Sequence, residues 1–250
     1  MESGPLIDLA LFGAGAFAAA LVAGLAGFAF GLVAMAIWLH LLTPTQTAIL
    51  IVLYALIVQG YAVWKLRHAL KPRRLLPFVI GGAIGIPIGV ELLRVAPAAS
   101  MRIGIGVFMV AFSLYSLLKP AIAPLKGERP LADGGIGVLS GIVGGATGLA
   151  GILPTLWSTL RGWPKDEQRA VFQPVGVALF FIMAAWLGGT GTIDGPTIRL
   201  FLIGLPAVLL GTWAGLRLYG RLDEASFRKV VLVLLLLSGL ALVLPGLLAP

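Results

Sequence analysis

Apolar side chains follow one another along most of this chain in runs long enough to cross a membrane. About 20 apolar residues are needed to cross roughly 30 Å of hydrocarbon. Runs of this length are 46–64, 75–93, 102–118, 170–188, 198–216 and 230–248. The stretches 9–41 and 134–160 are also apolar, but they are too long for one span and are rich in glycine. This pattern predicts an all-α polytopic membrane protein.

The composition excludes a soluble protein. Of the 250 residues, 59% are hydrophobic and only 11% are charged, whereas soluble domains carry about 25% charged residues. The mean hydropathy is +1.04, so too little polar surface remains to cover a soluble core. The absence of cysteine excludes disulfides and cysteine-ligated metal centres. The net charge of +8 is typical of basic cytoplasmic loops, so it does not indicate a nucleic-acid partner.

The chain carries an internal repeat. Superposing 73–102 on 199–228 without a gap gives eight identities in thirty positions, including Gly85/Gly211 and Gly89/Gly215. Both long stretches also contain a glycine cluster, Gly24–Gly31 in the first and Gly144–Gly151 in the second. We therefore predict two homologous halves, 1–118 and 134–250. The proline-containing segment 119–133 is their linker.

These motifs resemble the TauE/SafE sulfite exporter family. The resemblance rests on the glycine-rich opening of each half, the basic loop after Trp64, and the glycine- and proline-rich run Leu76–Gly89. It covers nearly the whole chain and implies a duplicated multi-span carrier of sulfite, sulfonates or other small anions. One departure concerns the span after the first glycine cluster, where family members often show a Thr-Ser pair. Here the matching residues, Ala48–Ile51, have no hydroxyl group.

The basic residues distinguish two topologies, because lysine and arginine collect in cytoplasmic loops. If 9–41 and 134–160 each cross once as long broken helices, nine basic residues lie on each side. If each is a re-entrant hairpin of two half-helices of about 12–16 residues, fifteen lie inside and three outside. We therefore predict an inverted repeat. Each half has a re-entrant hairpin followed by three transmembrane helices, and both termini are external.

The predicted spans carry no ionisable residue near the middle, where proton relays and ion paths would need one. Asp133 and Asp194 are expected in loops, and Glu91 near a span end. No metalloprotease, aspartyl-protease or serine-protease motif is present. The sequence therefore predicts neither an enzyme, a metal site nor a cofactor.

The glycine clusters are the candidate binding site. A half-helix that begins at the bilayer midplane presents free backbone N–H groups and a positive dipole end to an anion. Two such starts are expected, near Gly27 and near Gly148. The candidate substrate-binding residues are Gly24, Gly27, Gly31, Gly144, Gly145, Thr147, Gly148, Gly151 and Gln173.

Each candidate also has a structural interpretation. The glycines allow close helix packing, Thr147 can bond the carbonyl four residues earlier, and Gln173 can satisfy the backbone beside Pro174. Packing is also the interpretation of the second glycine motif, Gly81, Gly85, Gly89, Gly211 and Gly215.

The function predicted is a secondary carrier of small anions in the plasma membrane, working by alternating access. The resemblance implies sulfite or another organosulfur or carboxylate anion as substrate. The alternatives are a membrane assembly or scaffold subunit and a passive anion channel. The expected partners are the anion and the lipid bilayer, and a homodimer is one assembly that the sequence allows.

Overall fold

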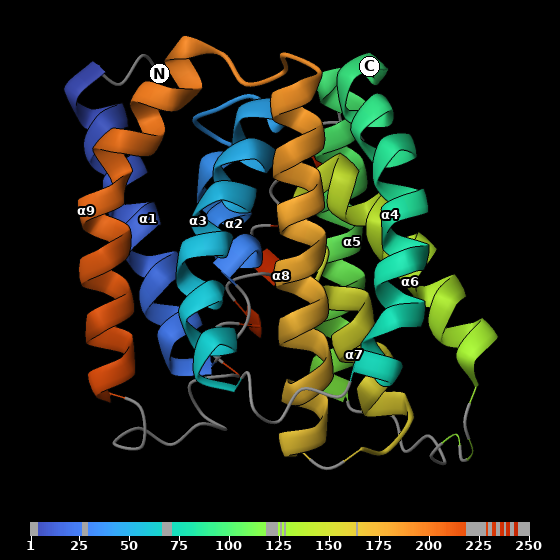
Figure 1. Ribbon diagram of the computed structural model, residues 1–250. Coiled ribbons are helices and arrows are strands. Elements are labelled where there is room, and N and C mark those ends of the chain that lie inside the picture. Colours follow the sequence, from blue (N-terminus) through green and yellow to red (C-terminus); the bar gives the residue numbers. More distant parts are fainter. Residues whose placement is uncertain are drawn as a thin grey trace. The chain divides into compact units, whose positions relative to one another are not determined.

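The computed structural model of the protein describes residues 5–26, 30–66, 72–118, 125, 127, 129–163 and 165–218, together with several positions between 229 and 244. All regular structure within these residues is helical, which confirms the predicted all-α class (Figure 1). The helices are α1 (Pro5–Ala26), α2 (Phe30–Trp38), α3 (Pro44–Leu66), α4 (Pro72–Val95), α5 (Ala98–Leu118), α6 (Pro130–Thr147), α7 (Ile152–Leu160), α8 (Lys165–Gly189) and α9 (Gly195–Leu218). The predicted span 230–248 lies largely outside the described residues.

The long helices α4, α5, α8 and α9 match predicted spans, whereas α1 covers the first part of the predicted hairpin 9–41. Among the described residues α1, α4, α5, α8 and α9 are long and apolar enough to cross a membrane. Helix α3 contains a shorter apolar stretch, Pro44–Gly60. A capping box fixes its start: the Gln46 backbone N–H donates to Thr43 Oγ1 at 3.2 Å, and the Thr43 N–H donates to Gln46 Oε1 at 3.4 Å. Pro44 then occupies the first helical position, where no N–H is required.

Each glycine-rich stretch forms two helices of unequal length. Helices α1 and α2 have 22 and 9 residues, and α6 and α7 have 18 and 9. The prediction of arms of about 12–16 residues was therefore wrong. Glycine alone does not end a helix: α1 and α6 run through glycines that pack against neighbouring helices.

The second helix of each stretch returns along the first. Trp38 at the end of α2 stacks on Phe12 with a centroid distance of 5.1 Å, and its Nε1–H donates to the Phe12 carbonyl oxygen at 3.2 Å. In the other stretch, Trp157 Nε1–H near the end of α7 donates to Asp133 Oδ1 in the first turn of α6 at 2.7 Å. In both stretches a tryptophan thus holds the end of the short helix beside the early turns of the long one.

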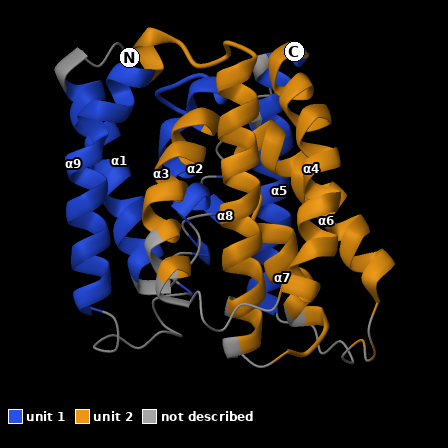
Figure 2. Cartoon of the chain, viewed as in Figure 1, with its two compact units in different colours: residues 1–47, 96–120, 198–250 blue, residues 48–95, 121–197 orange. Residues whose placement is uncertain are grey.

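The chain divides into two compact units, which do not follow the sequence halves (Figure 2). Unit 1 contains 1–47, 96–120 and 198–250, and unit 2 contains 48–95 and 121–197. Each unit therefore takes helices from both sides of the linker.

The second glycine motif lies at close helix contacts in both units, as predicted. In unit 2, a Cβ on Gly85 or Gly89 of α4 would overlap the carbonyl oxygen of Val138 or Ile142 on α6. In unit 1, a Cβ on Gly211 or Gly215 of α9 would overlap the carbonyl oxygen of Phe17 or Leu21 on α1. The glycine pairs that align in the sequence therefore make the same kind of contact twice.

Candidate functional site

The candidate site in unit 2 is the break between α6 and α7. Gly148 has φ 81°, a left-handed conformation that L side chains rarely adopt, and its N–H donates to the Gly144 carbonyl oxygen. This residue ends α6, whereas the sequence placed the start of the second half-helix near it. The N-terminus of α7 lies further along, at Gly151 and Ile152.

Helix α3 packs directly against this break. A Cβ on Gly148 would lie 3.0 Å from Ile51 Cγ2 and 3.1 Å from the Ala48 carbonyl oxygen. Residues 48–51 are at most 1% exposed. Residues 48–51, where family members often carry a Thr-Ser pair, therefore form a buried apolar contact with Gly148 and offer no hydroxyl group.

The start of α7 lies close to Gly176 of the long helix α8. A Cβ on Gly176 of α8 would lie 3.9 Å from the Cα of Gly151 and 3.5 Å from Oε1 of Gln59 on α3. Gln173, one turn earlier on α8, is buried at 4% exposure. Gly151 itself has open space where a Cβ would project. Gly176 is therefore a common neighbour of Gly151, at the start of α7, and of Gln59 on α3.

Several other predicted site residues have structural contacts of their own. A Cβ on Gly145 would meet the backbone of Gly89 on α4, and a Cβ on Gly144 would lie 2.8 Å from the Ala150 Cβ. Thr147 Oγ1–H donates to the Val143 carbonyl oxygen at 2.6 Å, and the Thr147 Oγ1 accepts from the Leu149 N–H. The Thr147 hydroxyl group therefore stabilises the end of α6.

The first glycine cluster lies in unit 1. A Cβ on Gly24 would lie 2.9 Å from the Thr212 carbonyl oxygen on α9, so this residue sits at a helix contact. Gly31 is half-buried near the start of α2. Gly27 lies outside the described residues.

The surroundings of Gly151 are apolar. The core of unit 2 includes Ala150 and apolar side chains from α3, α4 and α8: Ile49, Val52, Ala55, Phe78, Ile86, Val90, Val171, Val175, Leu179, Phe180, Met183 and Leu187. Within the part of the chain that the structure describes, no group of three or more histidine, aspartate or glutamate residues could hold a metal ion. A ligand at this break would meet the backbone dipoles at the start of α7.

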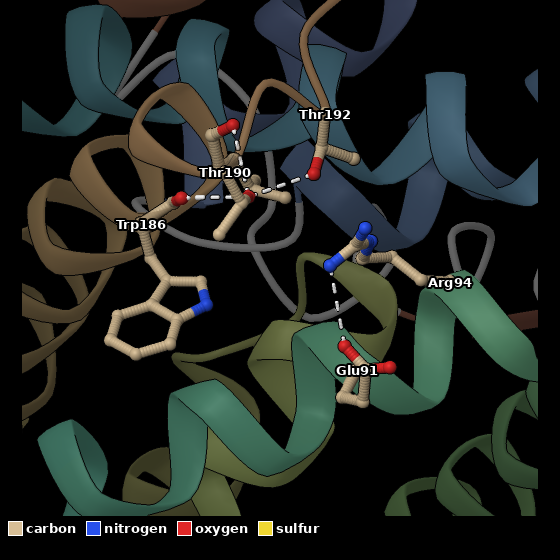
Figure 3. A network of polar contacts seen from close by, with 6 residues as sticks. Glu91, Arg94, Trp186, Thr190 and Thr192 are labelled. Carbon is tan, nitrogen blue, oxygen red and sulfur yellow. Dashed lines mark hydrogen bonds and ion pairs between the residues drawn. The ribbon is translucent and has the colours of Figure 1, made fainter.

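The charged groups of unit 2 lie near helix ends. Glu91 and Arg94, in the last turns of α4, are exposed and lie 3.4 Å apart. Figure 3 shows this pair near Thr190 and Thr192, which follow α8. A second cluster joins Asp133 and Arg161, which are 3.4 Å apart with side-chain exposures of 15% and 6%. The sequence predicted a loop position for Asp133, but this residue lies in the first turn of α6, and Arg161 directly follows α7. Trp157 and Arg161 lie one helical turn apart at the end of an apolar run. This spacing is the sequence signal that both contact Asp133.

The comparison with known protein families agrees with this architecture. The family model "Sulfite exporter TauE/SafE" matches residues 11–242. The chain belongs to the sulfite exporter TauE/SafE family. No curated protein and no solved structure gave a significant match.

Membership in the TauE/SafE family assigns the chain to membrane transport rather than to enzyme catalysis. The family match spans both glycine-rich stretches and all nine described helices from Leu11 onward. The apolar helices are those expected of an integral membrane transporter.

Proposed function

We propose that this TauE/SafE protein is a secondary carrier of small anions, with sulfite or another organosulfur or carboxylate anion as substrate. The observation that carries the proposal is the start of α7, which lies beside Gly176 of α8 and follows the buried core residue Ala150. An anion there would meet the positive end of a helix dipole and amide N–H donors. The lack of a side chain on Gly151 leaves room for its approach.

The remaining candidates fall into two groups in this proposal. Gly151 and Gln173 contribute to the site directly, with Gln59 as an additional donor. Gly144, Gly145, Thr147 and Gly148 shape the break that positions α7. The residues Gly24, Gly27 and Gly31 would play the matching part in the first half.

Contacts within unit 2 support the hairpin topology. The Leu125 N–H donates to the Leu160 carbonyl oxygen at 3.0 Å, so the linker lies beside the end of α7. Arg74, at the start of α4, pairs with Glu167 of α8 at 3.0 Å. The loops around 65–74, 119–129 and 161–169 therefore share one side in this proposal. That side is the cytoplasm of a plasma-membrane protein.

The glycine contacts support an inverted repeat. The α4–α6 contact in unit 2 and the α9–α1 contact in unit 1 involve sequence-equivalent glycines on α4 and α9. Two such halves, oppositely oriented in the membrane, would expose the site alternately to each side. Because the described spans carry no ionisable group at mid-depth, transport would follow the anion gradient, anion exchange or Na⁺ rather than ΔpH.

Counterflow in proteoliposomes tests the proposal. Vesicles loaded with unlabelled sulfite, a small sulfonate or a carboxylate should transiently accumulate the same labelled anion, because a carrier exchanges substrate across the membrane. A passive channel would equilibrate the label without this overshoot. A scaffold subunit would give no protein-dependent flux of sulfite, the sulfonate or the carboxylate. Equilibration without overshoot, or no flux at all, would contradict the proposal.

A matched pair of glycine variants tests the site. Gly151→Leu should abolish anion-dependent thermal stabilisation, because the new side chain blocks N–H contacts worth about 1.5–3 kcal/mol each when the acceptor is charged. Gly135→Leu on α6 is the control, since a Cβ there also has open space around it. Both variants should fold. If Gly151→Leu still responds to the anion as the parent does, the substrate does not bind at the start of α7.

A further inference from the structure

The second feature of unit 2 that requires an explanation is the buried charge at the end of α7. The Asp133 carboxylate accepts from Trp157 Nε1–H at 2.7 Å and pairs with Arg161 at 3.4 Å. The Arg161 Nη2 donates to the carbonyl oxygen of Gly127 in the linker. The Arg161 side chain is 6% exposed, and its Nε is buried with no hydrogen-bond partner among the described residues.

Arg161 also connects this pair to two other helices. Its guanidinium carbon lies 5.3 Å from the centre of the Trp163 ring. The guanidinium of Arg74, at the start of α4, lies 5.1 Å from the same ring. Arg74 in turn pairs with Glu167 near the start of α8. The end of α7 is thus held to α6 directly and to α4 and α8 through Trp163.

A purely structural junction would not need these charges. The equivalent junction in unit 1 uses the stacked pair Trp38 and Phe12, with one hydrogen bond from the Trp38 indole to a backbone oxygen. Burying an ion pair costs desolvation that an apolar contact avoids, and the unpaired Nε adds to this cost. Charged groups lower the free energy of an open junction, because water solvates both groups once they separate. A junction that has to open is therefore favoured by an ion pair.

We propose that Asp133 and Arg161 form a latch at the end of unit 2 where α4, α6 and α8 begin, and that this latch opens and closes in each transport cycle. The proposal rests on the function proposed above. Helix α7 has nine residues and is therefore about 13 Å long. It begins at the proposed anion site and ends at the latch. Because so short a helix moves as one rigid body, a movement at one end also moves the other end.

The chain lacks cysteine, so one introduced thiol can report on the latch. Ser158 on α7 is fully buried, and its carbonyl oxygen accepts from the Trp163 N–H at 3.2 Å. The Ser158→Cys variant should react slowly with a bulky water-soluble maleimide. Adding Asp133→Asn removes the carboxylate charge with little change of shape. It should raise the labelling rate about tenfold, while the melting temperature stays close to that of the parent.

Two further variants control the experiment. Glu91→Gln breaks an ion pair of the same length on the exposed end of α4, and the labelling rate of Ser158→Cys should not change. Asp133→Glu keeps the carboxylate and should restore slow labelling. Equal labelling in the Asp133→Asn and Glu91→Gln backgrounds would overturn the latch. Faster labelling that only parallels a falling melting temperature would also overturn it, because the cluster would then be a static junction.

Transport separates this proposal from the function on which it rests. Counterflow with unchanged labelling in Asp133→Asn would leave the carrier intact and refute the latch. Faster labelling without counterflow of any anion would support the opening of unit 2 and refute the carrier.

Discussion

Three acidic side chains near helix ends have three different environments. Glu91 is an exposed partner of Arg94, and such pairs contribute at most about 1 kcal/mol. Asp133 is mostly buried between Trp157 and Arg161. Asp194 precedes α9 and accepts the Thr197 N–H at 2.9 Å, so it caps that helix. Burial and partners, rather than residue type, thus determine what each carboxylate does.

The Asp194 cap predicts a pH-dependent stability. Hydrogen bonding to Thr197 lowers the pKa of Asp194 below its ordinary value. A group with a lowered folded-state pKa stabilises the protein above its unfolded pKa, and this contribution is lost as the pH falls through the folded pKa. Asp194→Ala should therefore melt at a lower temperature than the parent at neutral pH. The gap should narrow below about pH 4.

Thermal melting followed by tryptophan fluorescence, from neutral to acid pH, measures this gap. Asp194→Asn is the control, because asparagine caps helices nearly as well and does not titrate. The melting temperature of Asp194→Asn should differ little from that of the parent at neutral pH. A gap for Asp194→Ala that is constant across the whole pH range would contradict the ionised cap.

At the scale of elements, contacts between glycine-bearing helices hold each unit together. A membrane offers little hydrophobic driving force between helices, so they associate where small residues let their backbones approach. Helices α4 and α6 make such a contact along their lengths, through Gly81, Gly85 and Gly89 on one side and Gly137 and Gly141 on the other. Helices α9 and α1 repeat it.

This packing predicts opposite effects on stability for glycine-to-alanine changes at close helix contacts and at an open position. Gly85→Ala places a methyl group against the Val138 carbonyl oxygen, so it should destabilise the protein by about 1–3 kcal/mol. Gly211→Ala should act similarly through Phe17. Gly104→Ala on α5 has open space around its Cβ and should stabilise the protein by up to about 1 kcal/mol, because alanine favours helix.

Melting temperatures in one detergent compare the three variants. If Gly85→Ala melts as high as Gly104→Ala, the close α4–α6 contact is not present in solution.

At the scale of the whole molecule, each of the two units combines helices that precede the linker with helices that follow it. Helix α4 precedes the linker and packs on α6, which follows it. Helix α1 is similarly covered by α9. A fragment ending at 118 would lose the partners of both α1 and α4, so the predicted halves describe the repeat in the sequence and not independent compact bodies.

The proposed hairpins predict the orientation of the chain. Reporter fusions after Pro250 should be external, and fusions within 119–133 should be cytoplasmic, because only this arrangement places fifteen basic residues inside and three outside. Paired reporters that are active on opposite sides of the membrane measure both positions. A cytoplasmic carboxyl terminus would contradict the re-entrant hairpins and favour eight simple spans.

The sequence by itself determined the membrane class, the family, the positions of most helices and the packing role of the second glycine motif. These follow from local properties: the length of apolar runs, the proline and threonine residues at helix starts, and glycine spacing along one helix face. Thr147 is another such case, because the acceptor of its hydroxyl group lies within its own helix.

Only the tertiary structure decided which helices meet. It showed that α3 packs against Gly148 and that Gly176 lies near both Gly151 and Gln59. It also showed that Asp133 and Arg161 are a buried pair. Each of these depends on residues far apart in the chain. A helix face lined with glycine can pack against several different helices, so its sequence does not identify its partner. A charged residue next to a span has the same sequence pattern whether its side chain meets water or another helix.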